Sequence, residues 1–417
     1  MDGSGAGTRL FCSSVHVAHI IDRLDGIGGV QTYLADVVPA LAQREIKSTL
    51  IVGHLNGESR FAGARLVSAP ETQLDGPRMD DAASRHLATT LAELGVDACI
   101  THIAPSPAVA AVTARVTPTL VFAHDYYPAC PGYARYLHSS ERFCHEGPGL
   151  RCYARAYTER CTNRRPDRLV RATRRERAWR TGWDVVARII VASPFVAGVL
   201  AADGAPADRT AVVPYFVPPA TPSNDTERCD VLFMGRLVRL KGAHVLLRAL
   251  AAIPDATAVI GGDGPERSHL ERLASELNIA DRVRFPGVVA PRERDRLLGG
   301  AKVFALPSLW SEPFGISGLE ALAAGVPVVG SDTGGIPSWL PDNEAGLLVP
   351  PGEDGALADA LSLVLSDDEL RGRMAAAAQL TASRFSLDSH VDRLISLIVE
   401  AKAWAQSEPA DKPGAAL

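Results

Sequence analysis

Residues 308–320 read Ser-Leu-Trp-Ser-Glu-Pro-Phe-Gly-Ile-Ser-Gly-Leu-Glu and decide the fold that we expect. They place two carboxylates, Glu312 and Glu320, eight positions apart across a loop and the start of a predicted helix. An apolar run that ends at Pro307 precedes this segment, and the strand-like run 326–329 follows it. Free amides at a helix N-terminus bind phosphate, and a carboxylate beside them accepts hydrogen bonds from the paired hydroxyls of a sugar. The pattern therefore predicts a site for a sugar nucleotide.

Short apolar runs alternate with helical patterns on both sides of this segment. In the first half, the runs expected to form strands are 15–21, 49–52, 98–103, 119–123 and 189–193. In the second half, they are 230–234, 256–260, 283–285, 303–306, 326–329 and 346–349. This alternation is typical of parallel β-α-β units, whose ligands bind beyond the carboxyl ends of the strands. We therefore expect an α/β protein with two Rossmann-like, doubly wound domains that face each other across a cleft.

A polar segment at 218–228, rich in Pro, Ser and Thr, separates the two series of strands and is the expected linker. A chain of 417 residues is long enough for two domains, which we place at 1–217 and 229–385. Residues 386–405 have an amphipathic pattern and are expected to form a C-terminal helix that packs back onto the first domain. The first eight and the last dozen residues are expected to be disordered.

The composition, with 47% hydrophobic and 22% charged residues, is that of a soluble globular protein. The net charge of −5 argues against general nucleic-acid binding. Residues 1–10 have no apolar core behind a basic start, so no signal peptide is expected. The longest apolar stretch, 185–202, is interrupted by Arg188 and Pro194, and it is therefore not a predicted membrane span. We expect a cytoplasmic protein whose seven cysteines are reduced thiols or metal ligands.

Two loops that follow predicted strands carry groups suited to phosphate. Gly28 and Gly29 follow the first strand, where glycines let the backbone approach an anion closely, although they equally suit a tight turn. Arg236 and Lys241 lie five positions apart in the loop after the first strand of the second half. Two cations there can clamp a diphosphate and stabilise the charge that grows as it departs. The alternative is that they are solvated loop cations, which is what we expect of Arg239 between them.

The loop 261–265 contains Gly262 and Gly264 between a predicted strand and a predicted helix. A dinucleotide-binding fingerprint that starts at Gly262 requires a third glycine at the position of Arg267. The loop therefore supports a hydride-transfer enzyme only weakly. We expect it to approach a nucleotide closely through its backbone.

Two further side chains are candidates because of where they stand in the sequence. Glu320 lies in the apolar stretch 316–324, where an unpaired carboxylate is costly, so a ligand or a cation is expected beside it. His124 ends the predicted strand 119–123 and is expected to face the cleft. It is therefore either a ligand contact or a structural histidine.

With these motifs, the chain resembles the retaining GT-B glycosyltransferases of family four. The resemblance covers almost all of the second half and the key loops of the first half. It rests on four motifs taken together, which are Glu312-x7-Glu320, Gly235-Arg236…Lys241-Gly242, the loop 261–265, and Gly28-Gly29.

The resemblance implies a role for each matching residue. Glu320 would hold the ribose hydroxyls of the donor, and Glu312 would contact the donor sugar together with the backbone at Phe314, Gly315 and Ile316. Arg236 and Lys241 would bind the diphosphate, and His124 would lie beside the donor sugar. The catalytic set implied is Arg236, Lys241, His124 and Glu312. The remaining donor-binding residues implied are Gly28, Gly29, Gly262 and Gly264.

The implied reaction moves a sugar from a nucleotide-sugar donor to a hydroxyl-bearing or other nucleophilic acceptor with retention at the anomeric carbon. The leaving phosphate takes the proton of the acceptor, so no side chain acts as nucleophile. The family uses no catalytic metal, and the chain has no Asp-x-Asp motif, so no cofactor besides the donor is expected. A natural-product intermediate, a polysaccharide precursor and a glycolipid precursor remain open as acceptors. Two other classes remain as alternatives: a nicotinamide-dependent oxidoreductase, and a nucleotide-sugar-binding protein without turnover.

The segment after His124 departs from the family pattern. Cys130, Cys144, Cys152 and Cys161 fall within 32 residues, and four thiolates can bind a structural Zn²⁺ ion tetrahedrally. The spacing contains no Cys-x2-Cys knuckle. Two interpretations remain open, namely a structural zinc site that orders an acceptor-side loop and four separate reduced cysteines.

Residues 151–180 contain eleven arginines and only three acids. Such a segment could attract an anionic acceptor, a protein partner or a phospholipid surface as a peripheral membrane contact. The alternative is an ordinary solvated helix.

Overall fold

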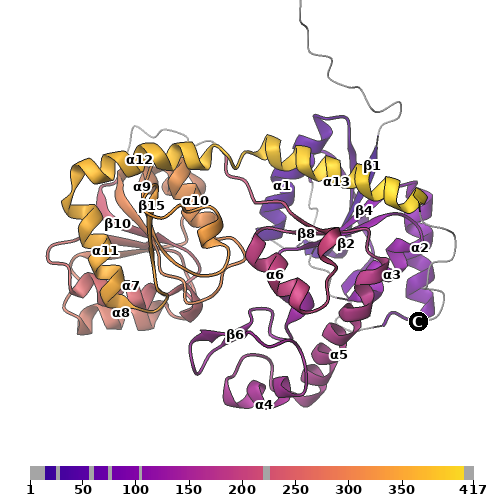
Figure 1. Cartoon of the computed structure of the whole chain (residues 1–417), viewed down its shortest axis with the longest axis horizontal. Coiled ribbons are helices and arrows are strands. Elements are labelled where there is room, and N and C mark those ends of the chain that lie inside the picture. The colour runs from indigo at the N-terminus through magenta and orange to yellow at the C-terminus, as the bar shows by residue number, and fades with distance from the viewer. Residues whose placement is uncertain are drawn as a thin grey trace, which may run out of the picture.

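The computed structural model describes residues 15–24, 29–55, 61–73, 78–102, 106–218 and 226–407. Residues 1–8, Gly28, residues 219–225 of the expected linker and residues 408–417 lie outside these ranges. Within them the chain forms two parallel sheets, each with helices on its faces (Figure 1).

The first sheet has seven strands in the order β3-β2-β1-β4-β5-β8-β9, and all its pairs are parallel. β4 and β5 are wholly buried, and β1 is buried except at Asp22 and Arg23, as expected of strands covered on both faces. The strands are β1 (His16–Leu24), β2 (Lys47–Leu55), β3 (Ala64–Ser68), β4 (Ala98–His102), β5 (Thr119–Ala123), β8 (Arg188–Val191) and β9 (Thr210–Val212).

The second sheet has six parallel strands in the order β12-β11-β10-β13-β14-β15. In both sheets the first strand of the series pairs with strands on either side, so the strand order reverses there and a crevice opens at the carboxyl ends. The predicted doubly wound α/β architecture is therefore confirmed. The strands are β10 (Cys229–Met234), β11 (Ala258–Gly261), β12 (Val283–Gly287), β13 (Ala301–Leu306), β14 (Val328–Ser331) and β15 (Gly346–Val349).

Helices begin where the sequence supplies caps. Ser106 and Ser193 accept backbone N–H groups at the starts of α3 and α6, and a proline follows each of them at the first helical position. The helices of the first lobe are α1 (Gly29–Ala42), α2 (Asp81–Leu94), α3 (Pro107–Ala114), α4 (Arg151–Thr158), α5 (Pro166–Gly182) and α6 (Pro194–Ala202). Those of the second are α7 (Ala243–Ala251), α8 (Arg267–Glu276), α9 (Pro291–Gly300), α10 (Ile316–Ala323), α11 (Asp354–Ser366) and α12 (Asp368–Ala382).

The last helix, α13 (Leu387–Ser407), returns from the second lobe and lies across the first (Figure 1). Its apolar face is buried against α1, β4 and β5. Arg44, in the turn after α1, pairs with Asp388 at 2.7 Å and with Asp392 at 2.9 Å, and Lys402 pairs with Asp97 at 2.6 Å. Surface pairs of this kind contribute little, so the apolar face holds the helix in place.

Three elements of the structure were not predicted. β3 and β9 close the two edges of the first sheet, and their side chains are mostly half-exposed. Edge strands of this kind lack the continuous apolar run that identifies a central strand. The third is the short antiparallel hairpin of β6 (Tyr136–Leu137) and β7 (Arg142–Phe143), which has two residues in each strand.

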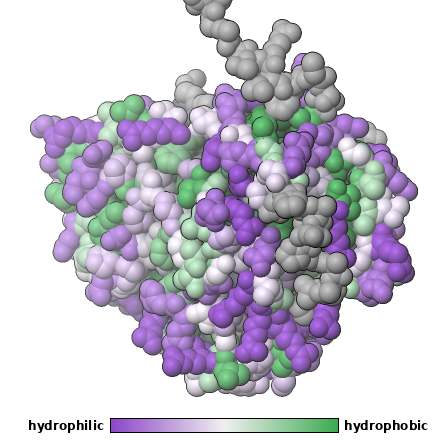
Figure 2. Space-filling model, turned by 45° about the vertical axis from the view of Figure 1, so that its right-hand side comes forward, coloured by the Kyte–Doolittle hydropathy of each residue, from purple (hydrophilic) through white to green (hydrophobic). Residues whose placement is uncertain are grey.

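The surface turned to the viewer in Figure 2 is largely hydrophilic, with hydrophobic side chains in small, scattered groups. None of the helices in the described ranges is both long and apolar enough to cross a membrane.

Candidate active site

The two motif loops of the second sheet meet at the ends of β10 and β13. Lys241 lies in a short turn after β10, and its Nζ donates to both carboxylate oxygens of Glu312, at 2.8 and 2.9 Å. Ser308 donates its hydroxyl to the same carboxylate at 2.5 Å. Glu312 is only 5% exposed. The cation and the carboxylate that the sequence places in separate motifs thus form one ion pair at the crevice.

The loop that carries Glu312 is braced by the turn after β14. The backbone N–H of Gly335 donates to the carbonyl of Glu312 at 2.7 Å. Gly334 has a φ of 62°, and a Cβ there would lie 2.4 Å from the carbonyl oxygen of Glu312. A side chain at this position would push the loop away, so glycine is required to hold Glu312 in place.

The other two cations of the 235–242 loop have different environments. Arg236 is exposed, and its side chain has no hydrogen-bond or ion-pair partner among the described residues. It is therefore available to a ligand. Arg239, which was expected to be a solvated loop cation, instead pairs with Glu141 of the first lobe at 2.6 Å. That expectation was wrong because the partner is nearly a hundred residues away in sequence.

Glu320 lies in the second turn of α10 and is paired with a cation, as its apolar surroundings required. Arg294 of α9 donates to its Oε1 at 2.9 Å. Burial raises the pKa of Glu320, and Arg294 opposes that shift. The other oxygen, Oε2, has no protein hydrogen-bond partner among the described residues, which leaves it available to a ligand hydroxyl.

Phe314 and Gly315 place no exposed side chain at the start of α10, whereas the Ile316 side chain is 38% exposed. Phe314 is 2% exposed and packs against Tyr215 and Trp339, with ring centroids 5.6 and 6.4 Å away. Gly315, with a φ of 92°, precedes the first residue of α10, Ile316. The first amides of a helix have no partner within it, so those of Ile316 and Ser317 are open to phosphate or sugar oxygens, while the Gly318 N–H donates to the Gly315 carbonyl.

Gly262 and Gly264 serve the packing of two loops. A Cβ on Gly262 would lie 1.9 Å from the carbonyl oxygen of Gly235, and one on Gly264 would lie 2.4 Å from that of Leu237. The close backbone approach expected here is therefore to the loop that carries Arg236. Arg267, at the third position of the fingerprint, donates to the Phe285 carbonyl at 3.0 Å. Of the first-lobe glycines, Gly29 begins α1 and is exposed.

His124 belongs to a hydrogen-bonded chain that runs inward from the crevice. Its Nδ1 lies 2.5 Å from the hydroxyl of Tyr215, and its Nε2 lies 2.9 Å from Nδ1 of His102. Nε2 of His102 lies 3.1 Å from Nδ1 of His19. Burial lowers the pKa of His124 to about 3 and that of His19 to about 4. His124 is therefore neutral at physiological pH, and both of its ring nitrogens are occupied by protein groups.

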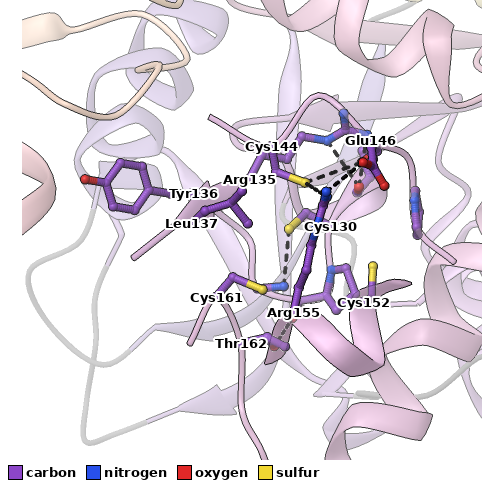
Figure 3. A pocket seen from close by; sticks show the side chains of 14 residues that line it. Cys130, Arg135, Tyr136, Leu137, Cys144, Glu146, Cys152, Arg155, Cys161 and Thr162 are labelled. Atoms are coloured by element: carbon purple, nitrogen blue, oxygen red, sulfur yellow. Dashed lines mark hydrogen bonds and ion pairs between the residues drawn. The ribbon is translucent and has the colours of Figure 1, made fainter. Parts of the chain in front are cut away.

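The four clustered cysteines come together around one small cavity (Figure 3). All of them are free thiols. Burial raises the pKa of Cys130 to about 12 and that of Cys161 to about 11, so neither is a reactive thiolate at neutral pH. Among the residues that the structure describes, no three His, Cys, Asp or Glu side chains already form a set of metal ligands.

The arginine-rich segment 151–180 divides into buried and exposed parts. Arg175 is fully buried, where it contacts Glu176 at 2.5 Å and the hydroxyl of Tyr127 at 2.5 Å. Arg155 pairs with Glu146 at 2.6 Å. The segment is therefore not a uniformly solvated helix, because some of its arginines form ion pairs with acidic side chains of the protein.

A hollow of about 320 Å³ lies where the two lobes meet beside the Glu312 loop. The first lobe contributes aromatic and imidazole rings, and the second contributes polar groups of the turn after β14. Its lining includes Phe143, His145, Phe195, Ser311, Asp332 and Thr333.

Several residues of the site were not found by sequence reasoning. Ser308, Arg294 and Tyr215 contact Glu312, Glu320 and His124, respectively. Ser308 is the first residue of the segment 308–320, so its position four residues before Glu312 could have identified it. Arg294 and Tyr215 are 26 and 91 positions from their partners, and no local pattern marks them.

Comparison with known families agrees with this geometry. Residues 27–221 match the model of Glycosyltransferase Family 4, and residues 220–381 match that of Glycosyl transferases group 1. The two matches meet at the expected linker and together extend over both sheets.

Curated relatives match over part of their length. The D-inositol 3-phosphate glycosyltransferase of Corynebacterium urealyticum is 39% identical over 191 residues, which are 43% of this chain and 45% of that protein. The lipopolysaccharide core biosynthesis glycosyltransferase LpsE of Rhizobium meliloti is 33% identical over 225 residues, which are 54% of this chain and 61% of that protein. The chain thus spans about half the length of the curated relatives that it matches.

Solved structures match over almost the whole chain. Anabaena HepE, whose structure is a complex with UDP, superposes with a TM-score of 0.69 at 19% identity, covering 92% of this chain and 100% of that one. The sucrose-phosphate synthase of Thermosynechococcus elongatus superposes with a TM-score of 0.69 at 21% identity, covering 93% and 99%. At this level of identity the likeness shows the fold alone. The two family models, which together extend over residues 27–381, show that the chain belongs to the family-four glycosyltransferases, and the solved structures show that its fold is GT-B.

Proposed function

We propose that this chain transfers a sugar from a nucleotide-sugar donor to a hydroxyl group of an acceptor, with retention at the anomeric carbon. The observation that carries the proposal is the Lys241–Glu312 ion pair beside the open N-terminus of α10. Glu320 lies one turn further into that helix with one carboxylate oxygen unbonded by the described protein. A cation and free helix amides suit a diphosphate, and a carboxylate with a free oxygen suits the hydroxyls of a ribose.

In the proposed reaction, the bond between the anomeric carbon and the leaving phosphate oxygen breaks on the same face on which the acceptor oxygen bonds. The leaving phosphate takes the proton of the acceptor hydroxyl. Lys241 and the exposed Arg236 stabilise the diphosphate charge that develops. Glu312 orients Lys241 and contacts the donor sugar, and the amides of Gly315 and Ile316 hold its oxygens.

His124 contributes as a neutral group in this proposal. Its two ring nitrogens bond to Tyr215 and His102, so it shapes the wall of the site beside the donor sugar and does not donate a proton from a charged ring. Tyr215 in turn packs edge-on against Phe314, which links this wall to the donor loop.

UDP is the first nucleotide to test, because it is bound in the structure of Anabaena HepE. We propose that the second lobe, 229–385, binds the donor, that 1–217 is the acceptor side, and that 218–228 joins them. We propose a cytoplasmic enzyme in which no metal takes part in the transfer, so turnover should not depend on added Mg²⁺.

Thermal unfolding in the presence of nucleoside diphosphates tests the proposed donor site. A ligand at about 100 times its dissociation constant adds roughly 2.7 kcal/mol to the free energy of unfolding. We expect one of UDP, GDP or ADP to stabilise the wild type by this amount and to leave Glu320→Ala unshifted. Glu344→Ala, on the exposed turn before β15, is the matched control and should respond like the wild type. Stabilisation by NAD or NADP alone would instead support the oxidoreductase alternative.

The non-catalytic alternative predicts the same nucleotide binding, because it keeps the fold and the site. Only the formation of a glycosidic product separates the two. The nicotinamide alternative lacks a phosphate-binding loop. Arg267 stands where the fingerprint has its third glycine, and Gly262 and Gly264 are used to pack two loops together.

A further inference from the structure

We propose that Cys130, Cys144, Cys152 and Cys161 bind one structural Zn²⁺ ion, which braces the segment that connects the first lobe to the donor loop. Four cysteines are a complete tetrahedral ligand set for zinc. On binding, each thiol gives up its proton to solvent and becomes a zinc-bound thiolate. The site is separate from the transfer chemistry and adds a metal that the proposed reaction does not use.

The first support is convergence. The four cysteines come from the turn after β5, the end of β7, helix α4 and the loop after α4, yet all of them line one cavity of about 20 Å³. That volume suits a single ion or water molecule and nothing larger. Because separate elements place the four cysteines around one small cavity, the arrangement favours a shared ligand over four unrelated cysteines.

The second support is the polar surroundings of the sulfur atoms. The backbone N–H of Gly132 points at Sγ of Cys130 at 3.3 Å, and the guanidinium of Arg155 contacts Sγ of Cys144 at 3.2 Å (Figure 3). Zinc with four thiolates carries a net negative charge, which donors of this kind stabilise. Ordinary buried thiols need no such donors.

The third support is that the segment 130–161 contains little regular secondary structure. Its regular structure is a hairpin with two residues in each strand and an eight-residue helix. Tyr133, Arg135, Glu141 and Arg160 all have φ values between 49° and 65°, and they are half of the described non-glycine residues with positive φ. Such conformations persist only where the surroundings enforce them. Side chains such as Tyr136 and Leu137 are buried, and a structural metal adds to this packing in a segment with so little regular structure.

The segment matters because it reaches the donor loop. Trp310 donates its indole N–H to the carbonyl of Ala134 at 2.7 Å, and Glu141 pairs with Arg239 at 2.6 Å. The ring of Trp310 lies 5.5 Å from Nζ of Lys241. A metal that orders segment 130–161 therefore also stabilises the loop that carries Lys241, which the proposed reaction uses to bind the diphosphate.

Zinc binding requires the thiols to turn toward the middle of the cavity, because they do not yet form a set of metal ligands. The Arg155 side chain lies among the cysteines with its tip at Cys144 (Figure 3). It is also held by Glu146 at 2.6 Å, so it can keep that partner when Cys144 changes rotamer.

The test is the metal content of the full-length chain after loading with Zn²⁺ and removal of excess metal. We expect about one zinc ion per wild-type chain and almost none in Cys152→Ala. Cys229→Ala is the matched control, because Cys229 is a buried cysteine of β10 outside the cluster, and it should keep the metal. Amide exchange across 130–161 should slow when Zn²⁺ is added to the stripped wild type.

Cobalt substitution of the wild type keeps the test decisive if Cys152→Ala does not fold. Co²⁺ bound by four thiolates gives the intense visible bands of a tetrahedral site. A wild type that holds no zinc and gives no such bands overturns the proposal, and so does a chain in which these cysteines form disulfides. Metal content is measured without donor or acceptor, so this result is independent of the glycosyltransferase proposal.

Discussion

Replacing Lys241 by alanine is expected to lower kcat about 100- to 1,000-fold while the chain stays folded. The ammonium group is the only cation that the structure places on the Glu312 carboxylate among the described residues, and it faces the crevice at the end of β10. Removing one preorganised charge that stabilises a departing anion costs about 3–4 kcal/mol of barrier. Turnover is measured as nucleotide release from the donor that stabilises the wild type.

Two further variants separate catalysis from stability in this experiment. Lys241→Ala leaves the buried carboxylate of Glu312 without its cation, which also destabilises the fold. Adding Glu312→Gln removes that charge, so the double variant should regain stability but not turnover. Lys302→Ala, which breaks a surface pair with Asp230, is the control and should behave like the wild type. Near-normal turnover of Lys241→Ala would show that the assignment of the diphosphate contact is wrong.

Acidification from pH 6.5 to pH 4 is expected to lower the free energy of unfolding steeply, before most carboxylates titrate. His19 and His390 are buried and His124 is half-buried, and burial lowers their pKa values to about 4, 4 and 3, respectively. The unfolded chain binds protons as the pH falls through about 6.5, and the native chain does not until about pH 4. The stability that these groups contribute is therefore complete above pH 6.5 and is lost toward pH 4. His19 alone accounts for a loss of about 3 kcal/mol in the free energy of unfolding between pH 6.5 and pH 4.

One neighbouring group acts in the opposite direction. Burial raises the pKa of Asp125 to about 6, so the native state takes up a proton there that the unfolded state does not. Between pH 6 and pH 4, this proton uptake offsets the loss of stability caused by roughly one of the histidines. Carboxylates with lowered pKa values, such as Asp97 and Glu400, lose their contributions at lower pH.

Urea unfolding at a series of pH values measures the effect. We expect His19→Gln to reduce the pH slope by about one proton, or about 1.4 kcal/mol per pH unit. The same substitution at His54, which is exposed on β2, should leave the slope unchanged. If His19→Gln shows the wild-type slope, the histidine chain is not the source of the acid sensitivity.

Much of the donor loop could be predicted because its determinants are local. Glu312, Gly315 and Glu320 lie within nine residues, and a strand, a loop and a helix start fix their relative positions. Lys241 follows an adjacent parallel strand, and carboxyl ends of adjacent strands meet at one edge, so its proximity to Glu312 also follows from the architecture.

The remaining contacts depend on side chains that approach each other across the fold. His102 and Tyr215 enclose His124 from positions 22 and 91 residues away, and nothing in the sequence near His124 marks them. The sequence therefore left His124 as either a ligand contact or a structural histidine, and it could not show that both ring nitrogens are occupied. The convergence of the cysteines likewise depends on turns with positive φ at non-glycine residues such as Tyr133, which no simple turn pattern predicts.

The measurement that tests the central claim most directly is the proton NMR spectrum of the reaction with the stabilising nucleotide sugar and a panel of hydroxyl acceptors. If no acceptor of the panel reacts, transfer to water is measured instead, and its product is the free sugar. We predict a new glycosidic or hemiacetal signal with the anomeric configuration of the donor, formed together with the nucleoside diphosphate. A wild type that binds the nucleotide yet forms no product would support the non-catalytic alternative, and a product of inverted configuration would contradict the proposed mechanism.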